Sequence, residues 1–237
     1  MSNMYDEAKT WAVFKGCRFN CSYCIPSFQR QSKRWGKGNC QKCYDYEPHF
    51  HEERLDRIPS SRIVFVGGSS DLFFCPTEHL EKIVERIKEH QPRKEKTFYF
   101  QSKVPQTFER IEEELPDNCV ILTTCETNKH VFSDGSSYGD YSQARTPSER
   151  LKDFIELSYE RKVLTVEPIM EFTETFGYQI SRIPNLEGVW IGYNTRPDDV
   201  DLPEPSQRQV SRLIKILEDH DIEVKKKDLR GVEDYEG

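Results

Sequence analysis

The stretch GCRFNCSYC, residues 16–24, places Cys17, Cys21 and Cys24 (the cysteine triplet) within eight residues. It directly follows TWAVFK, residues 10–15, a run of aromatic and β-branched residues that predicts a strand. Three thiols this close can form a disulfide, bind a metal or pack in a core. The spacing C-x3-C-x2-C favours an iron–sulfur cluster, because the short intervals keep three thiolate ligands on one face. A structural zinc ion normally has four protein ligands, so three cysteines indicate an open metal position.

Short β-rich runs alternate with amphipathic helical segments along most of the chain. Segment 77–90, for example, carries Leu80, Ile83 and Ile87 at helical spacing, with Thr77 as the predicted N-cap. Two-residue hairpin signals are missing between the runs, so the pattern predicts an α/β fold with a parallel sheet and helical crossovers. The predicted strands are 10–15, 62–67, 97–102, 119–124, 163–168 and 188–193, with a last strand at 222–226, and the predicted helices are 77–90, 105–115, 147–162 and 206–220.

Two segments interrupt this alternation, and each follows the C-terminal end of a predicted strand. Residues 26–61 form a basic insertion that carries cysteine and histidine, and residues 129–146 form a loop rich in Gly, Ser and Tyr. Long loops in a compact fold are usually functional, and parallel α/β proteins place their active sites at this end of the sheet. Because no internal repeat or low-complexity linker is visible, we expect residues 1–237 to form a single domain that contains this insertion.

The triplet resembles the hallmark C-x3-C-x-aromatic-C of the radical SAM superfamily, with Tyr23 at the aromatic position. The resemblance implies a partial (β/α)6 TIM-like barrel, which agrees with the six strand–helix units read from the sequence pattern. It also implies a 4Fe-4S cluster bound by the triplet, with S-adenosylmethionine (SAM) on the fourth iron. In that family, an electron from a flavodoxin- or ferredoxin-type donor cleaves SAM to methionine and a 5′-deoxyadenosyl radical, which abstracts hydrogen from a substrate.

A glycine-rich segment, GGSSD at 67–71, ends the second predicted strand. Radical SAM proteins carry a GGE-like motif there that contacts the methionyl amine, and the resemblance transfers this role to Gly67, Gly68, Ser69 and Ser70. The usual acid is replaced by serine, and Asp71 follows as a predicted substrate-pocket residue; a simple glycine turn is the structural alternative. PHFHEERL (48–55), GGSSDLF (67–73), TTCETNK (123–129) and VEPIM (166–170) are similar to a poorly characterised group of radical SAM proteins from phages, bacteria and archaea.

Polar side chains gather where the other predicted strands end, and in a barrel these positions converge on one mouth. Glu126, Glu167 and Asn194 suit hydrogen bonds to the ribose, methionyl group and adenine of SAM. Each could instead cap its own loop. The other residues predicted for the substrate pocket are Gln101, Lys103 and Asn128, and the candidates for quenching a product radical are Cys125 and the tyrosines of 138–141.

A second metal site is a candidate in the insertion, where Cys40, Cys43, His49 and His51 (the Cys/His quartet) lie within twelve residues. Two thiolates and two imidazoles suit zinc, although C-x2-C-x5-H-x-H is not a standard zinc-finger spacing. Cys75 could replace one histidine as a ligand. The alternatives are an auxiliary iron–sulfur cluster, or thiols and histidines that bind no metal.

Composition limits the partners and the compartment. The formal charge of −7 disfavours broad, non-specific binding to nucleic acid. No signal peptide is visible at the N-terminus, and no stretch reaches the ~18 apolar residues of a membrane span. We therefore expect a soluble, cytoplasmic protein without a membrane partner, whose eight cysteines serve metal binding or thiol chemistry rather than disulfides. Cys119 starts a predicted strand and is expected in the core.

Two local clusters of basic residues stand out against the acidic total. The basic patch of the insertion consists of Arg30, Lys33, Arg34 and Lys37, accompanied by the aromatic residues Phe28 and Trp35. Such a patch can bind nucleic-acid phosphates and stack bases, or it can be a solvated helix face. The second cluster, VKKKDLR (224–230), carries Lys226, which could point into the barrel from a last strand.

Three functions follow from these observations. The first is a radical SAM enzyme that abstracts hydrogen from an unidentified substrate. The second is a radical SAM enzyme that modifies or repairs a nucleic acid. The third is a non-catalytic iron–sulfur or zinc protein, such as an electron carrier, although a carrier would normally complete its cluster with four cysteines.

Overall fold

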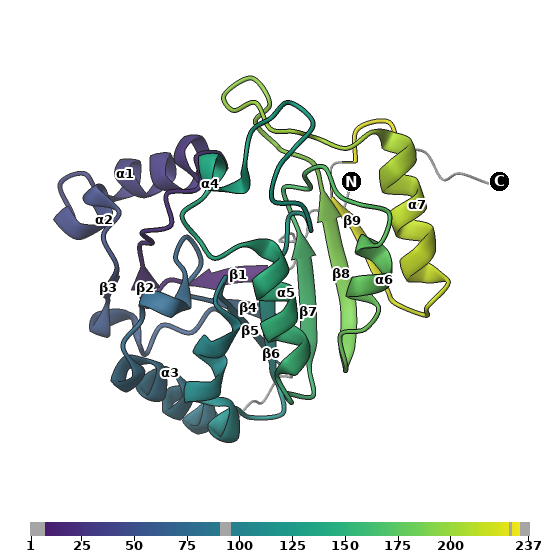
Figure 1. Cartoon of the computed structure of the whole chain (residues 1–237). Helices are drawn as coiled ribbons and strands as arrows, with labels where there is room; N and C mark the ends of the chain where they lie inside the picture. Colours follow the sequence, from purple (N-terminus) through teal and green to yellow (C-terminus); the bar gives the residue numbers. More distant parts are fainter. Residues whose placement is uncertain (1–7, 91–95, 228, 233–237) are drawn as a thin grey trace.

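The computed structural model describes residues 8–90, 96–227 and 229–232 (Figure 1). Residues 1–7, on which the predicted absence of a signal peptide partly rests, lie outside the described residues, as does Asp228 in the second basic cluster. Within the described ranges, no helix combines the length and the apolar character that crossing a membrane requires.

A parallel sheet of seven strands organises the chain (Figure 1). Each strand pairs in parallel with the next one, so the α/β fold with helical crossovers is confirmed. The sheet curls into a partial barrel, and its last strand confirms the strand predicted near 222–226. In spatial order, the strands are β1 (Ala8–Trp11), β4 (Ile63–Val66), β5 (Thr97–Gln101), β6 (Cys119–Thr124), β7 (Lys162–Val166), β8 (Leu186–Gly192) and β9 (Val224–Lys227).

Both faces of the sheet are covered over much of their area. The larger apolar cluster joins the outer face to the helices, and the smaller one lies on the inner face around Phe65, Tyr99 and Leu122. This double burial explains why all six residues of β6 are buried and none is charged. Figure 1 shows the helices that cover the outer face: α3 (Thr77–Glu89), α5 (Pro147–Glu156), α6 (Phe176–Ile180) and α7 (Gln207–Glu218).

Two helices begin or end at residues other than those predicted. Helix α3 has Pro76 at its N-cap, so Thr77 is its first residue rather than its cap. Helix α5 ends at Glu156, because the chain then extends through Leu157 towards β7. The predicted helix 147–162 is therefore too long at its C-terminus.

Segment 105–115 is helical but not α-helical. It forms two short 3-10 helices, Pro105–Arg110 and Glu112–Glu114, separated at Ile111, where φ is −142° and ψ is 0°. Phe108 and Ile111 are nevertheless buried in the outer core. The apolar spacing thus predicted the burial correctly, whereas the local backbone geometry departs from an α-helix.

The first predicted strand, 10–15, is divided between two sheets. Strand β1 ends at Trp11, and after a two-residue turn β2 (Phe14–Lys15) pairs antiparallel with β3 (His49–Phe50). The partner strand belongs to the insertion, more than thirty residues away in sequence. Only this tertiary pairing reveals the division.

The insertion and the 129–146 loop lie at the end of the sheet towards which the strands point (Figure 1). A π-helical turn at Ile25–Gln29 leads into α1 (Arg30–Gly36) and α2 (Gln41–Asp45), and the loop contains α4 (Tyr138–Tyr141). The amide of Gln143 donates to the carbonyl of Phe19 at 2.8 Å, so the loop contacts the triplet segment directly.

Candidate active site

A cavity of about 200 Å³ lies at the C-terminal ends of the strands. The triplet segment, the GGSSD turn and the ends of several strands form its walls, as the barrel prediction requires. The predicted site residues that line it are Cys17, Cys21, Tyr23, Cys24, Gly68, Ser69, Ser70, Asp71, Gln101, Lys103, Glu167 and Asn194.

The triplet loop is joined to the neighbouring glycine turn. Gly16 pairs with Ser70 in a parallel bridge, and the Gly16 amide donates to the Ser69 carbonyl at 3.3 Å. Because this bridge directly precedes Cys17, it holds the triplet beside the end of β4. The loop therefore reaches the place where the family resemblance expects SAM to bind.

Two triplet sulfurs have hydrogen-bond partners from the protein. The backbone amide of Phe19 donates to the Cys17 Sγ at 3.5 Å, and the Cys21 Sγ lies 3.1 Å from the Ser142 hydroxyl. Hydrogen bonds to ligand sulfurs are one of the means by which proteins tune iron–sulfur clusters. The protein therefore supplies hydrogen-bond partners for two of the three sulfurs, as it would for the ligands of a cluster.

The triplet and the quartet differ in how closely their ligand atoms approach. All four ligand atoms of the quartet lie within 4.8 Å of one another, and among the described residues the triplet forms no such compact group. Ligands of a 4Fe-4S cluster bind different iron atoms, so they need not converge on one point as the quartet does. The chemistry of the three free thiols, which all line one cavity, fits such a cluster.

The GGSSD turn depends on its glycines for two reasons. Gly67 has a φ of +76°, in the left-handed region that glycine adopts without strain. A Cβ at Gly68 would lie 2.7 Å from the Thr10 Cγ2, so a side chain there would have to displace the side chain of Thr10. Gly68 lines the cavity with Ser69 and Ser70, whereas Gly67 supports the turn from outside the cavity wall.

Asp71 lines the cavity, but its carboxylate is already engaged. It accepts hydrogen bonds from the Ser102 hydroxyl at 2.7 Å, the Lys103 amide at 2.8 Å and the Phe73 amide at 3.0 Å. Burial raises the pKa of Asp71, and the hydrogen bonds from Lys103, Phe73 and Ser102 oppose that shift. Asp71 thus joins the turn to the end of β5.

Glu126 lies behind the cavity wall, at the centre of a buried polar network. Arg150 Nη2 donates to Glu126 Oε2 at 2.7 Å, and both side chains are fully buried. Lys103 Nζ forms an ion pair with Glu126 Oε1, and the Tyr23 hydroxyl donates to the same oxygen. Arg150 also donates to the Tyr138 hydroxyl at 2.7 Å. Since Tyr23 and Lys103 line the cavity, the network fixes the wall beside the triplet.

Two cations keep Glu126 ionised. Burial is the largest single influence and by itself raises the pKa of this carboxyl group. The charges of Arg150 and Lys103, together with the hydrogen bonds from Lys103 and Tyr23, outweigh burial and lower the pKa of Glu126 to about 2. Behind the wall, Glu126 is therefore a carboxylate at neutral pH, in contact with the ammonium of Lys103 and the phenol of Tyr23.

Asn194 lines the cavity but also caps its own loop, which is the structural alternative left open by the sequence. Its Nδ2 donates to the Val200 carbonyl at 2.7 Å, and its Oδ1 accepts from the Arg196 amide at 3.0 Å. Gln101, at the end of β5, donates to the Thr124 hydroxyl at 3.0 Å. Both side chains are therefore pre-oriented by the protein.

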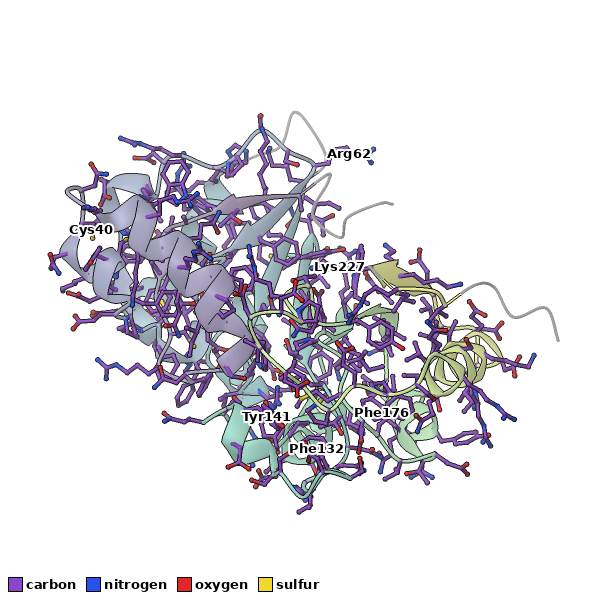
Figure 2. The ribbon with its side chains drawn as sticks, turned by 90° about the horizontal axis from the view of Figure 1, so that it is seen from above. Cys40, Arg62, Phe132, Tyr141, Phe176 and Lys227 are labelled. Carbon is purple, nitrogen blue, oxygen red and sulfur yellow. The ribbon has the colours of Figure 1, made fainter. Side chains whose placement is uncertain are left out.

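The cation supplied by the last strand is Lys227 rather than Lys226. Lys227 lines the cavity and forms an ion pair with Glu167, and Figure 2 shows it near the middle of the molecule seen from above. Successive residues of a strand face opposite sides, so a shift of one position exchanges the faces. The sequence located the strand correctly but placed the wrong lysine in the barrel.

Cys125 and Asn128 do not line the cavity. Cys125 is fully buried in the outer core, where its thiol donates to the Pro147 carbonyl at 3.2 Å. Asn128 donates to the Thr173 hydroxyl and to the Gln179 Oε1, both at 2.7 Å. After β6 the chain turns outwards at these residues, so the geometry does not support the predicted roles in radical quenching and substrate binding.

The remaining cysteines and candidate tyrosines are placed as follows. Cys75 and Cys119 are buried in the outer core, and Cys75 is not part of the compact quartet. Tyr138 belongs to the network around Glu126, whereas the Tyr141 hydroxyl lies 2.9 Å from that of Ser136. Cys119 is thus in the core as predicted, and of the two tyrosines only Tyr138 contacts the cavity wall.

Several site residues were missed by the sequence analysis. Arg150 stands one helical turn before the buried Phe154, so the helical spacing places a charged residue on an apolar face, a signal that could have been noticed. Thr124, the last residue of β6, and Thr165, the last but one of β7, line the cavity from the inner face. Tyr46 also lines it, but its position depends on the packing of the insertion, for which the sequence offers no signal.

The basic patch occupies α1, the residue that follows it and the turn before it. Its four cations are exposed, and Trp35 has 72% of its surface accessible. Phe28 is 42% exposed and also lines the cavity, so it connects the patch to the cavity mouth.

Comparisons with known proteins define the fold class. No protein-family model matches the chain, and no curated protein matches it. A mutant of spore photoproduct lyase with a dinucleoside spore photoproduct superposes with a TM-score of 0.60, at 10% identity, over 92% of this chain and 76% of that chain. A second mutant of that enzyme superposes with a TM-score of 0.58, at 10% identity, over 93% of this chain and 76% of that chain. A radical SAM methyltransferase from Sphaerobacter thermophilus has a TM-score of 0.48, at 10% identity, over 92% of this chain and 64% of that chain.

These likenesses concern the fold. The two superpositions on spore photoproduct lyase, together with the curled parallel sheet, confirm the prediction of a partial TIM-like barrel, with helices outside the sheet and a cavity at the C-terminal strand ends.

Proposed function

We propose that this chain is a radical SAM enzyme whose triplet binds a 4Fe-4S cluster and whose cavity receives SAM and a substrate. The observation that carries the proposal is that three free cysteines, the GGSSD turn and the polar strand ends meet in one cavity of a radical SAM-type barrel. Among the described residues that line this cavity there is no fourth cysteine, which an electron carrier would normally use to complete its cluster.

Held by Cys17, Cys21 and Cys24, the cluster would supply one electron for the reductive cleavage of SAM, the chemistry that leads to hydrogen abstraction from the substrate. A flavodoxin- or ferredoxin-type protein would donate the electron. The eight cysteines, all of them free, agree with a reducing compartment such as the cytoplasm.

The chain's own polar groups would bind and orient the reactants. Ser69 and Ser70 stand beside the triplet loop. The Ser69 hydroxyl can donate a hydrogen bond to the methionyl group, whereas the Ser70 hydroxyl already donates to the Gly67 carbonyl and can only accept one. Lys103 carries a charge into the cavity wall, and Glu126 holds it in place from behind. The Glu167 and Lys227 pair offers an acceptor and a donor for ribose or substrate hydroxyls.

Anaerobic reconstitution tests the proposal. The reconstituted protein should contain about four irons and four sulfides per chain in this cluster, and with SAM and dithionite it should release 5′-deoxyadenosine and methionine. Protein without dithionite is the matched control. A four-iron cluster that is reduced but never cleaves SAM would instead support the electron-carrier function.

A nucleic-acid substrate is the second candidate function, and the position of Phe28 favours it. This ring lies at the cavity mouth, next to the exposed cations of the basic patch. Cations that neutralise phosphates and an aromatic ring that stacks a base are the usual elements of single-strand binding.

Binding of mixed-sequence DNA and RNA, measured at low and moderate salt, tests this candidate. Replacing Arg30, Lys33, Arg34 and Lys37 by glutamine should weaken binding and flatten its salt dependence, while uncoupled SAM cleavage continues. Replacing Arg208 and Arg212 of α7 is the matched control, since α7 covers the outer face of the sheet. If no binding is detected at low salt, the substrate is a small molecule or a peptide.

A further inference from the structure

The Cys/His quartet forms a compact group away from the cavity. Figure 2 shows Cys40 at the outer end of the insertion, on the side away from Lys227. Cys40 is the N-cap of α2, and its sulfur accepts the amide of Cys43 at 3.4 Å. This turn puts both thiols on one side of the helix start, where β3 and the residue after it bring His49 and His51.

The distances within the quartet are close to those of ligands around one tetrahedral ion, or somewhat shorter. His49 Nε2 lies 3.4 Å from each of the two sulfurs, and His51 Nε2 lies 3.2 Å from the Cys43 Sγ. The two Nε2 atoms are 2.8 Å apart. Around a zinc ion with bonds near 2.3 Å to sulfur and 2.0–2.1 Å to nitrogen, neighbouring ligand atoms lie about 3.3–3.8 Å apart. A small outward movement would accommodate the ion.

The outer partners of the two histidines determine where the ring protons are. The Glu47 carbonyl can only accept a hydrogen bond, so His49 Nδ1, at 2.7 Å from it, carries the proton. His51 Nδ1 lies 2.7 Å from the carboxylate of Glu53 and is protonated for the same reason. In neutral rings, both Nε2 atoms then point lone pairs at each other and at the sulfurs. A cation between them removes this repulsion.

We propose that the quartet binds one structural Zn²⁺ ion. Two thiolates, two neutral imidazoles and Zn²⁺ form a site without net charge, which suits a place where Cys43 and His51 are buried. The set is complete with four protein ligands, as in structural zinc sites, and both histidines have the outer hydrogen bonds typical of zinc ligands. The proposal is independent of the chemistry assigned to the triplet.

The zinc site would stabilise the path of the triplet loop. Strand β3, which contains His49, pairs with β2 just before Gly16, and the His51 amide donates to the Val13 carbonyl at 2.7 Å. A Cβ at Gly16 would lie only 2.1 Å from the Glu47 carbonyl oxygen, so the chain between the zinc ligands rests directly on the triplet loop. Tyr46, in the same segment, lines the cavity.

Elemental analysis of two variants, expressed with ample zinc, tests the ion. A Cys17→Ala/Cys21→Ala/Cys24→Ala variant should contain about one zinc per chain, because one structural site binds one ion. Adding Cys40→Ser and Cys43→Ser should reduce zinc to background, whereas adding Cys75→Ser, a buried cysteine outside the quartet, should not. Equal zinc in all three proteins, or iron with sulfide in the first, would overturn the proposal.

Cobalt binding keeps the test valid if the serine variant does not fold. Co²⁺ added to the chelator-treated triplet variant should produce the visible bands of a tetrahedral thiolate complex at one equivalent. His49→Cys, which preserves four ligands, should still bind Co²⁺ with a stronger sulfur-to-metal band, and His49→Ala should bind it more weakly. Octahedral spectra, or identical spectra for the two histidine variants, would contradict the assignment.

Hydrogen exchange tests the effect on the triplet loop. Chelation of the metal should increase amide exchange in residues 13–19 and at Tyr46, and leave α7 unchanged. Unchanged exchange in residues 13–19 would show that the ion does not stabilise this loop.

Discussion

The two cysteine-containing sites of this chain are built differently. The quartet brings four ligand atoms within 4.8 Å of one another, and both of its histidines are oriented by outer hydrogen bonds. The triplet presents three thiols to an open cavity beside polar strand ends. Structural metal sites use all their ligand positions, whereas catalytic sites leave one free. The difference agrees with the two proposals made above, a structural zinc site in the insertion and a reactive centre at the barrel mouth.

The two sites also differ in the elements and the charged side chains that surround them. The quartet lies in short irregular elements at the outer end of the insertion (Figure 2). The triplet faces a wall in which Glu126, Arg150 and Lys103 form a network of buried charges. Gly16 is the point where the two regions touch.

Replacing the three cysteines of the triplet should have the largest effect, a loss of both the cluster and the activity. Replacing Cys17, Cys21 and Cys24 by alanine should abolish both the iron–sulfur absorbance and the formation of 5′-deoxyadenosine, because no ligand to the cluster remains. Iron and sulfide analysis together with chromatography of the nucleoside measures both. If this variant still held a catalytically competent cluster, the triplet would not be the cluster site, and the contrast between the triplet and the quartet would be wrong.

Breaking the buried network should affect stability next most strongly. Glu126→Ala leaves Arg150 buried without its partner, which should cost about 3–5 kcal/mol of unfolding free energy. Glu156→Ala removes only the exposed pair with Lys152 and is expected to change it by less than about 0.5 kcal/mol. Urea titrations of the two variants give the comparison. If both variants lost the same unfolding free energy, the buried network would contribute no more to stability than an exposed ion pair.

Lowering the pH should reduce the stability that ionised Glu126 gives to the folded chain. The pKa of Glu126 is lowered from 4.5 to about 2 in the folded chain, so its stabilisation is complete above about pH 4.5 and lost as the pH falls towards 2. At 1.36 kcal/mol for each pKa unit, the loss amounts to roughly 3 kcal/mol. Glu126→Gln cannot titrate, so the difference in unfolding free energy between wild type and this variant should shrink in that window. A constant difference from pH 6 to pH 2.5 would contradict the assignment.

A glycine substitution should reveal the junction between the sites. Gly16 and Gly38 both have left-handed φ angles, +88° and +77°, but only Gly16 has backbone atoms where a Cβ would lie. Backbone strain alone costs of order 1–3 kcal/mol, so Gly38→Ala measures that strain and Gly16→Ala adds the clash with Glu47. Thermal unfolding and zinc content of both variants test this difference. If both variants behave alike, the insertion does not rest on the triplet loop.

Much of the fold could be predicted from the sequence, because strand and helix patterns depend on local alternation of apolar residues. The bounds of β6 were predicted to the residue and those of α7 within two residues, and the predicted cavity at the strand ends is present. The division of the first strand could not be predicted, since β2 depends on pairing with β3 in the insertion. The 3-10 geometry of 105–115 likewise depends on the backbone at Ile111.

The sequence by itself determined which chemical groups this chain possesses and in which order its strands deliver them to the barrel mouth. Tertiary structure alone decided which of these groups face the cavity. Lys227 enters and Lys226 does not, because strand register selects one face; Cys125 and Asn128 turn outwards, because the chain bends after β6. Glu126 remains ionised because Arg150, from a helix 24 positions later, and Lys103, from the end of β5, both reach it. Side-chain direction and charge compensation are properties of neighbours in space, and neither can be read from neighbours in sequence.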